Sequence, residues 1–275
     1  MRSAVYLRAL IALIITISAA YYQRLTGPTH PLNVKLEWYG TEISGELTRN
    51  HSEPGNQPIQ ITVPDTSISA ILVYRRFNSG DKWIGMKMIR ENDELYGSLP
   101  HQPPAGKLEY FIQLQKGNDF KVLPQNLLVA TRFTGEVPTV ILGSHIIFMF
   151  FAMFLSNWAG IEAISKKQLM YNLTLWTAGV LFIGGMILGP VVQKFAFGEY
   201  WTGVPFGIDL TDNKTLISMV LWIVAAWLSY RRKASARVWI IVAAIVMLII
   251  FSIPHSMMGS ELNYKTGKIG TGKLN

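Results

Sequence analysis

Long apolar runs occupy the second half of the chain. They cover Thr139–Ser156, Leu169–Val192, Thr215–Tyr230 and Val238–Ile253. A helix that crosses a bilayer needs about 20 mainly apolar residues, and four such runs leave too little polar sequence to cover them in water. We therefore expect a four-helix transmembrane bundle over residues 138–258. The last two runs are short for a full crossing.

A fifth apolar run, Ala9–Tyr22, follows two arginines near the start of the chain. This pattern is typical of a signal peptide and equally of an uncleaved signal anchor, here over residues 1–26. Ser18 and Ala20 are small enough for a cleavage site, whereas an aromatic pair at 21–22 suits the membrane interface. Both alternatives export the segment that follows.

Residues 27–137 show a different pattern, in which short runs alternate between apolar and polar positions. In Asn33–Tyr39, for example, Val34 and Leu36 alternate with Lys35 and Glu37. Turn-forming residues separate the runs, and this spacing predicts an antiparallel, immunoglobulin-like β-sandwich. The expected strands are Asn33–Tyr39, Ile59–Val63, Ser69–Arg76, Lys82–Ile89, Glu94–Leu99, Lys107–Gln115 and Leu127–Phe133. The predicted fold class is therefore an α+β membrane protein.

The distribution of basic residues predicts how the chain is oriented in the membrane. The net charge is +8, with 25 basic and 17 acidic residues. The basic residues that flank the apolar runs are Arg2, Arg8, Lys166, Lys167, Arg231, Arg232, Lys233 and Arg237. Basic residues in short loops stay in the cytoplasm, so the sandwich and a tail of residues 259–275 are expected outside the plasma (inner) membrane. The net positive charge is then explained by membrane orientation, and it does not indicate that the protein binds nucleic acid.

Several kinds of chemistry find no support in the sequence. The chain has no cysteine, which excludes disulfides, thiolate metal sites and cysteine nucleophiles. Residues 267–273 approach a phosphate-binding loop, but Leu274 stands where that motif needs Ser or Thr. We find no arrangement of Ser, His and Asp in the sandwich that indicates catalysis.

Two histidines are candidate ligands. His145 lies about two turns inside an apolar run, and His255 follows Pro254 at the end of another. Two imidazoles at similar depth on different helices can ligate a b-type haem or another metal. In the alternative interpretation, His145 hydrogen-bonds a neighbouring helix and His255 is an interfacial residue beside a proline.

Small residues line one face of the third run, at Ala178, Gly185 and Gly189. This pattern predicts close helix packing, or alternatively room for a flat cofactor. The following aromatic loop, at residues 193–214, contains Trp201 and Asp209, and we expect it to cover the outer end of the bundle. Asp212 in that loop is placed to cap the next helix.

Two short segments resemble known families. The segments Leu95–Pro100 and Pro104–Ile112 resemble a hairpin of exported immunoglobulin-like and fibronectin-like modules, in which a strand ends in Leu-Pro and the next carries an aromatic pair. Ser260–Tyr264, with Gly267 and Gly270, is similar to the last-helix exit of uncharacterised bacterial four-helix integral-membrane proteins. The first resemblance implies a fold, and the second implies a bundle that sometimes holds haem.

Three functional classes follow. The first is a binding, assembly or accessory subunit of an envelope complex, whose partners are membrane lipid and other envelope proteins. The second is an electron carrier with b-type haem between His145 and His255. The third, a transporter or enzyme, is disfavoured because charged residues are scarce within the apolar runs.

Overall fold

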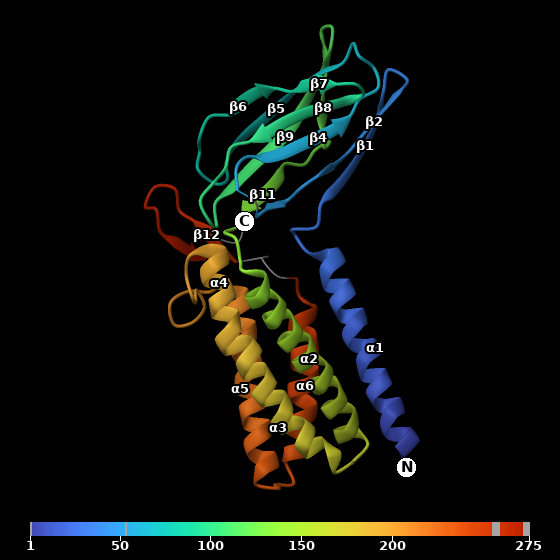
Figure 1. Cartoon of the computed structure of the whole chain (residues 1–275), viewed down its shortest axis with the longest axis vertical. Helices are drawn as coiled ribbons and strands as arrows, with labels where there is room; N and C mark the ends of the chain where they lie inside the picture. Colours follow the sequence, from blue (N-terminus) through green and yellow to red (C-terminus); the bar gives the residue numbers. More distant parts are fainter. Residues whose placement is uncertain (1, 53, 255–258, 272–275) are drawn as a thin grey trace. The chain divides into compact units, whose positions relative to one another are not determined.

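The chain folds as an α+β protein. Our computed structural model describes residues 2–52, 54–254 and 259–271. These residues form two compact units, which we call the helical unit and the sheet unit (Figure 1). The helical unit comprises the described residues of Met1–Pro28, Val137–Ser260 and Thr271–Asn275, and the sheet unit comprises those of Thr29–Glu136 and Glu261–Gly270.

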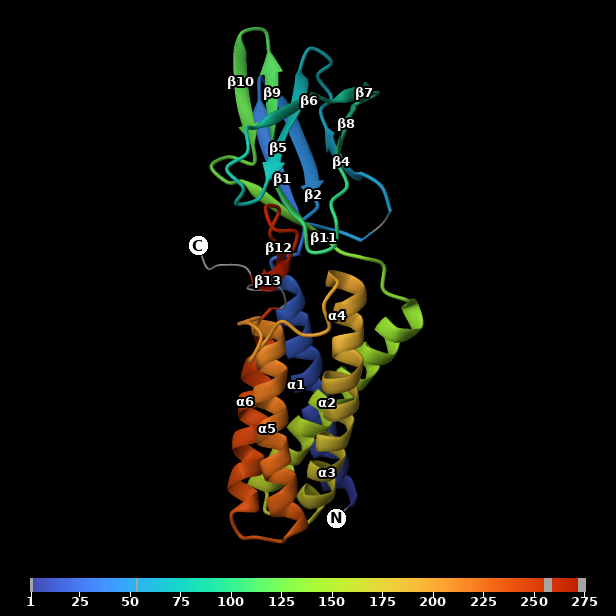
Figure 2. The same cartoon turned by 90° about the vertical axis from the view of Figure 1, so that its left-hand side faces the viewer.

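Two β-sheets make up most of the sheet unit (Figures 1 and 2). The first has the order β1-β2-β4-β8-β7, with strands Leu32–Trp38, Thr41–Leu47, Gln57–Thr62, Glu94–Leu99 and Ile89–Glu91. The second has the order β3-β11-β9-β5-β6, with strands Asn50–His51, Val129–Phe133, Lys107–Lys116, Ser69–Arg76 and Ile84–Lys87. Strand β10 (Asp119–Leu123) also pairs with β9, and the pairing of β3 with β11 is parallel.

Alternate positions of both sheets point into one hydrophobic core. Fully buried members include Ile43, Leu47, Leu72, Leu99 and Ile112, so each sheet supplies one apolar face. This is the arrangement that period-two alternation predicts. The two sheets therefore stabilise each other by burying their inner faces.

The predicted strand Lys82–Ile89 is two strands in the structure. Strand β6 ends at Lys87 and belongs to the second sheet, whereas β7 starts at Ile89 and belongs to the first. The buried residue between them, Met88, donates its backbone N–H to the carbonyl of Ala70 at 2.9 Å. The chain thus changes sheets at Met88, which an uninterrupted apolar–polar pattern does not reveal.

The helical unit contains α1 (Arg2–Thr26), α2 (Thr139–Ile164), α3 (Leu169–Leu181), the π-helix η1 (Phe182–Leu188), α4 (Gly189–Phe197), α5 (Leu210–Tyr230) and α6 (Ala236–Ser252). Three helical stretches are long and apolar enough to cross a membrane: Ser3–Thr26, Thr139–Ile164 and Leu169–Phe197. These three confirm the corresponding predicted runs. The last predicted run forms a shorter apolar helix of 17 residues, and α5 begins with the polar residues Asp212 and Lys214 in its first turns.

Helix α2 is longer than predicted, because the polar residues in its second half were read as the end of the apolar run. The prediction stopped at Ser156 because Asn157 and Glu162 interrupt the apolar run. Both side chains are buried against α1, where Asn157 Nδ2 donates to Thr16 Oγ1 at 2.9 Å and Arg8 Nε donates to Glu162 Oε1 at 2.9 Å. Helix α2 therefore continues to Ile164, because Asn157 and one carboxylate oxygen of Glu162 are paired with side chains of α1.

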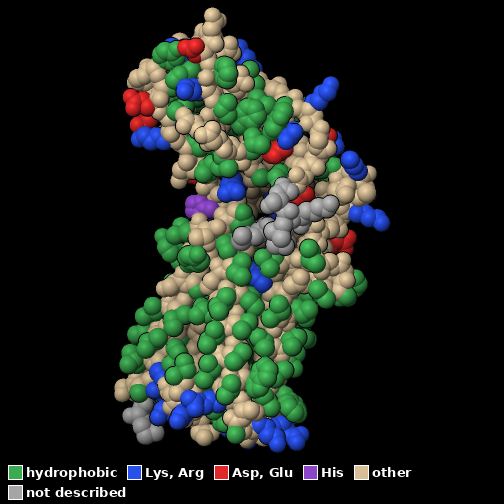
Figure 3. All heavy atoms as spheres, turned by 180° about the vertical axis from the view of Figure 1, so that it is seen from behind, with side chains coloured by type: hydrophobic (Ala, Val, Ile, Leu, Met, Phe, Trp, Pro, Cys, Tyr) green, Lys and Arg blue, Asp and Glu red, His purple; other side chains and the backbone are tan. Residues whose placement is uncertain are grey.

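Charge and apolar surface are separated on the helical unit. On the face shown in Figure 3, hydrophobic side chains cover the helical unit between its ends, and basic side chains gather at the end that carries the α2–α3 and α5–α6 turns. One of them, Arg237, donates Nε–H to the carbonyl of Ala163 at 2.9 Å. An apolar belt with a basic end is the distribution expected of a helical unit in a bilayer.

Residues 261–270 are part of the sheet unit, although the sequence placed them in a separate tail. They join strands β12 (Ser260–Leu262) and β13 (Ile269–Thr271). The Tyr264 hydroxyl accepts the backbone N–H of Lys107 and donates to its carbonyl, both at 3.0 Å. Lys107 also pairs with Glu261 through Nζ at 2.5 Å. This hairpin is thereby fixed to the start of β9.

Candidate functional site

The strongest candidate site surrounds His145 on α2. The ring Nδ1 of His145 lies 2.9 Å from the carbonyl oxygen of Gly184 in η1. A carbonyl can only accept, so Nδ1 carries the hydrogen and the Nε2 of the neutral ring presents a lone pair. Among the residues that the structure describes, none bonds to this Nε2.

The carbonyl that His145 contacts belongs to the π-helix η1. In η1, the N–H of Gly189 also bonds to the Gly184 carbonyl, five residues back in the chain. The carbonyl oxygen has two lone pairs and so serves both donors. Short π-helical segments inside α-helices are frequent at functional sites.

Glycines allow η1 to approach its neighbours. A Cβ at Gly184 would lie 2.9 Å from Phe148 Cβ, and a Cβ at Gly185 would lie 2.7 Å from Thr215 Cγ2. Such distances are below normal contact, so α2 and α5 pack directly on the glycine backbone. The sequence pointed to Ala178, Gly185 and Gly189 for packing. In the structure Ala178 packs against the helical core, and a Cβ at Gly189 would be 3.6 Å from the His145 ring.

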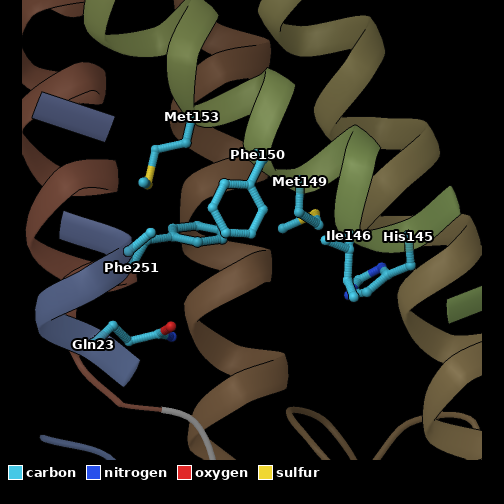
Figure 4. Close-up of a pocket in the computed structure, with 8 residues that line it drawn as sticks. Gln23, His145, Ile146, Met149, Phe150, Met153 and Phe251 are labelled. Carbon is cyan, nitrogen blue, oxygen red and sulfur yellow. The ribbon is translucent and has the colours of Figure 1, made fainter. Parts of the chain in front are cut away.

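A pocket adjoins His145 in the helical unit. Its lining residues come from α1, α2 and α6 and are Ala20, Gln23, His145, Ile146, Met149, Phe150, Met153 and Phe251. Figure 4 shows His145 at one end of this group, with Gln23 of α1 and Phe251 of α6 across from it. Two methionines and two phenylalanines make the lining mostly apolar.

The size of the pocket bears on the haem hypothesis. Its volume is about 150 Å³. Pockets for drug-sized ligands hold about 300–1,000 Å³, so a haem macrocycle does not fit this cavity as it stands. The proposed second ligand, His255, lies outside the described residues. The paired-histidine site therefore stays a prediction, and we derive no chemistry from it.

The aromatic loop between α4 and α5 is held by a buried polar cluster. Asp212 Oδ2 accepts the N–H of Thr202 at 2.6 Å and that of Gly203 at 2.9 Å. Asp209 caps α5 by accepting the N–H of Thr211 through Oδ1 at 2.8 Å, the role that was predicted for Asp212. Trp201 donates Nε1–H to the carbonyl of Val204 at 3.0 Å. The loop's polar groups thus bond to one another, and their role is to fix its conformation.

A second candidate site lies on the outer face of the second sheet. Arg75 on β5 pairs with Glu109 on β9, and its guanidinium lies 4.3 Å from the centroid of the Trp83 ring. Trp83 also packs edge-to-face against Phe111, with ring centroids 5.2 Å apart. Trp83 keeps 38% of its surface exposed. Sequence reasoning missed this group, because period-two alternation marks outer positions without saying which of them meet.

Comparison of the chain with protein-family models, with curated proteins and with solved structures finds no match. In the described residues, no group of three or more His, Asp or Glu side chains is placed to hold a metal ion.

Proposed function

We propose that this chain is an integral protein of the plasma membrane that displays an immunoglobulin-like domain outside the cytoplasm, as a binding or assembly subunit of an envelope complex. In this proposal α1 is a signal anchor, and α2, the continuous helix from α3 to α4, α5 and α6 form a four-helix bundle. The basic end of the helical unit faces the cytoplasm, since basic residues resist export.

The strand order supports the immunoglobulin-like assignment. The order β2-β4-β8-β7 corresponds to the A-B-E-D sheet of immunoglobulin domains, and β11-β9-β5-β6 corresponds to G-F-C-C′. Such domains serve many functions, so the fold alone does not carry the proposal.

The observation that carries the proposal is the group formed by the exposed Trp83 ring and the half-buried Arg75 and Phe111 side chains that hold it. Trp and Arg are enriched among the residues that dominate binding energy at protein interfaces. The carboxylate of Glu109 neutralises the positive charge of Arg75. This face therefore suits a partner with an apolar surface patch. The edge-to-face contact with Phe111 and the guanidinium of Arg75 also hold Trp83 in one position before binding, which lowers the entropy cost of association.

The test places a photo-crosslinking amino acid at position 83 of the full chain in living cells. We expect a crosslink to a specific envelope protein, and we expect Phe111→Ala to abolish it, because that change removes the ring that positions residue 83. The matched control places the same crosslinker at Ile89, which is 68% exposed on β7 of the other sheet.

Two results would overturn the proposal. One is an identical set of crosslinks from positions 83 and 89, which would show that contact follows exposure alone. The other is a crosslink from position 83 that persists unchanged in Phe111→Ala while the sheet unit remains folded.

A further inference from the structure

The pocket beside His145 has the two features of a site for a small ligand with one polar group. The first is a mostly apolar lining, in which Met149, Phe150, Met153 and Phe251 surround one space and Gln23 adds a polar side chain at its edge. The second is the lone pair on His145 Nε2, which follows from the hydrogen bond between Nδ1 and the Gly184 carbonyl. A ligand that fits both features is apolar over most of its surface and donates one hydrogen bond.

The volume of the pocket sets the size of the group that enters it. A cavity of about 150 Å³ is the size at which an apolar protein cavity accepts benzene. Methionine side chains are flexible and pack well against aromatic rings. One aromatic ring matches this volume, and the rest of a larger ligand would have to lie outside.

The position of the pocket indicates where the ligand comes from. Ile146 and Phe150 line it and are 44% and 48% exposed on the apolar surface of the helical unit. In a bilayer that surface meets lipid, so a ligand would enter from the hydrocarbon phase. A hydroxyl group reaching His145 from lipid would gain a hydrogen bond that the lipid itself does not offer.

We propose that this pocket binds the phenol-type head group of a lipid-soluble molecule, with its hydroxyl donating a hydrogen bond to His145 Nε2 and its ring lying among Met149, Met153 and Phe251. The proposal concerns the helical unit and does not rest on partner binding by the sheet unit. The Gly184 carbonyl positions the ring of His145 and fixes which nitrogen accepts.

The experiment uses the full chain in lipid nanodiscs, with ¹⁵N-labelled histidine and long-range ¹H–¹⁵N NMR at about pH 8, where an ordinary imidazole is neutral. The chain has five histidines, and the His145→Phe variant assigns the relevant signals by their loss. Phenol is the probe, and benzene is the matched compound without a hydroxyl. We expect phenol to shift the Nε2 resonance of His145 saturably, and benzene to leave it in place.

Two variants test the pocket itself. Met153→Phe adds bulk to the lining and should weaken phenol binding about tenfold, the equivalent of about 1.4 kcal/mol of overpacking. Ile147→Phe makes a comparable change at a residue that does not line the pocket and is 68% exposed, and it should leave binding unchanged. Trp83→Ala should also leave it unchanged, which separates this site from the proposed partner surface.

Three outcomes would overturn the inference: a shift that does not saturate with phenol, an equal shift with benzene, or a resting spectrum in which Nε2 rather than Nδ1 carries the hydrogen. Equal weakening by Met153→Phe and Ile147→Phe would also count against it, since only the first change reaches the pocket.

Discussion

The guanidinium of Arg8 donates a hydrogen bond from Nε to Oε1 of Glu162 at 2.9 Å, and the Glu162 side chain is fully buried. The same oxygen accepts the indole N–H of Trp158 at 3.1 Å. Removing one partner of a buried ion pair leaves an uncompensated charge, which costs about 3–5 kcal/mol. Separating α1 from α2 would therefore carry a large cost in free energy.

We predict that Arg8→Met lowers the free energy of unfolding of the helical unit by about 3 kcal/mol, because the Glu162 carboxylate is then buried without its cation. Adding Glu162→Gln to that variant should recover much of the loss. Unfolding in mixed detergent micelles measures both. Arg24→Met, at an exposed position of the same helix, is the control and should change little. A loss in the control as large as that in Arg8→Met would contradict the prediction.

The same contacts predict that the N-terminal segment is not cleaved from the mature protein. Cleavage near Ala20 would detach Arg8 from Glu162 and Thr16 from Asn157, and would leave the Glu162 carboxylate without its cation and Asn157 without its hydrogen bond to Thr16. We therefore expect the protein isolated from membranes to retain residues 1–26. Intact-mass analysis measures this directly. A mature chain that starts between residues 19 and 23 would show that the segment is a signal peptide.

Glycine substitutions should separate helix packing from helix propensity. A methyl group at Gly185 would meet Thr215 Cγ2 at 2.7 Å, whereas a methyl group at Gly143 meets nothing within 4 Å. We expect Gly185→Ala to destabilise the helical unit by about 1–3 kcal/mol through overpacking. Gly143→Ala should be neutral or stabilising by up to about 1 kcal/mol, because alanine favours the helix. Thermal unfolding in detergent compares the two, and equal effects would count against direct packing at Gly185.

The hairpin of residues 261–270 predicts a change in stability at alkaline pH. Burial raises the pKa of Tyr264 from 10.0 to about 12. Between these values the unfolded chain loses the hydroxyl proton before the folded chain does, so stability falls as pH rises from about 10 to 12. Tyr264→Phe should flatten this decline and should also cost about 1–2 kcal/mol at neutral pH through its two lost hydrogen bonds.

Urea denaturation of the sheet unit, followed by ¹⁹F NMR of fluorotryptophan at Trp38, measures this effect. Other groups in the unit also titrate: burial lowers the pKa of Lys107, which acts in the opposite direction, and burial raises the pKa of Tyr110. The difference between the wild type and Tyr264→Phe isolates Tyr264. Parallel pH profiles in the two proteins would contradict the prediction.

The sequence predicted those helices and strands whose own residues show the full hydrophobic pattern of the element. The alternation of Val34 and Leu36 with polar neighbours matches β1, and the apolar run at residues 139–156 lies inside α2. Strand β2 was missed because its seven residues, Thr41–Leu47, bury only Ile43 and Leu47 and contain Gly45. A Cβ at Gly45 would lie 2.8 Å from Ile61 Cγ2, so a close strand contact requires this glycine.

The candidate sites were only half predictable. The position of His145 inside an apolar run singled it out from sequence alone. Its partner, the Gly184 carbonyl, was not foreseeable, because a π-helical turn leaves no pattern in side-chain polarity. The meeting of Arg75, Trp83 and Phe111 depends on strand register and on the path of a loop, both of which are set by tertiary contacts.

The sheet unit is assembled from two stretches of chain that are far apart in sequence, Thr29–Glu136 and Glu261–Gly270. Because the ribosome works from the N-terminus, the second stretch is translated after every helix from α2 to α6. The Lys107 backbone N–H and carbonyl therefore gain their hydrogen bonds to Tyr264 only after α2 to α6 have been synthesised, so the sheet unit is completed later than the helices that interrupt it in sequence.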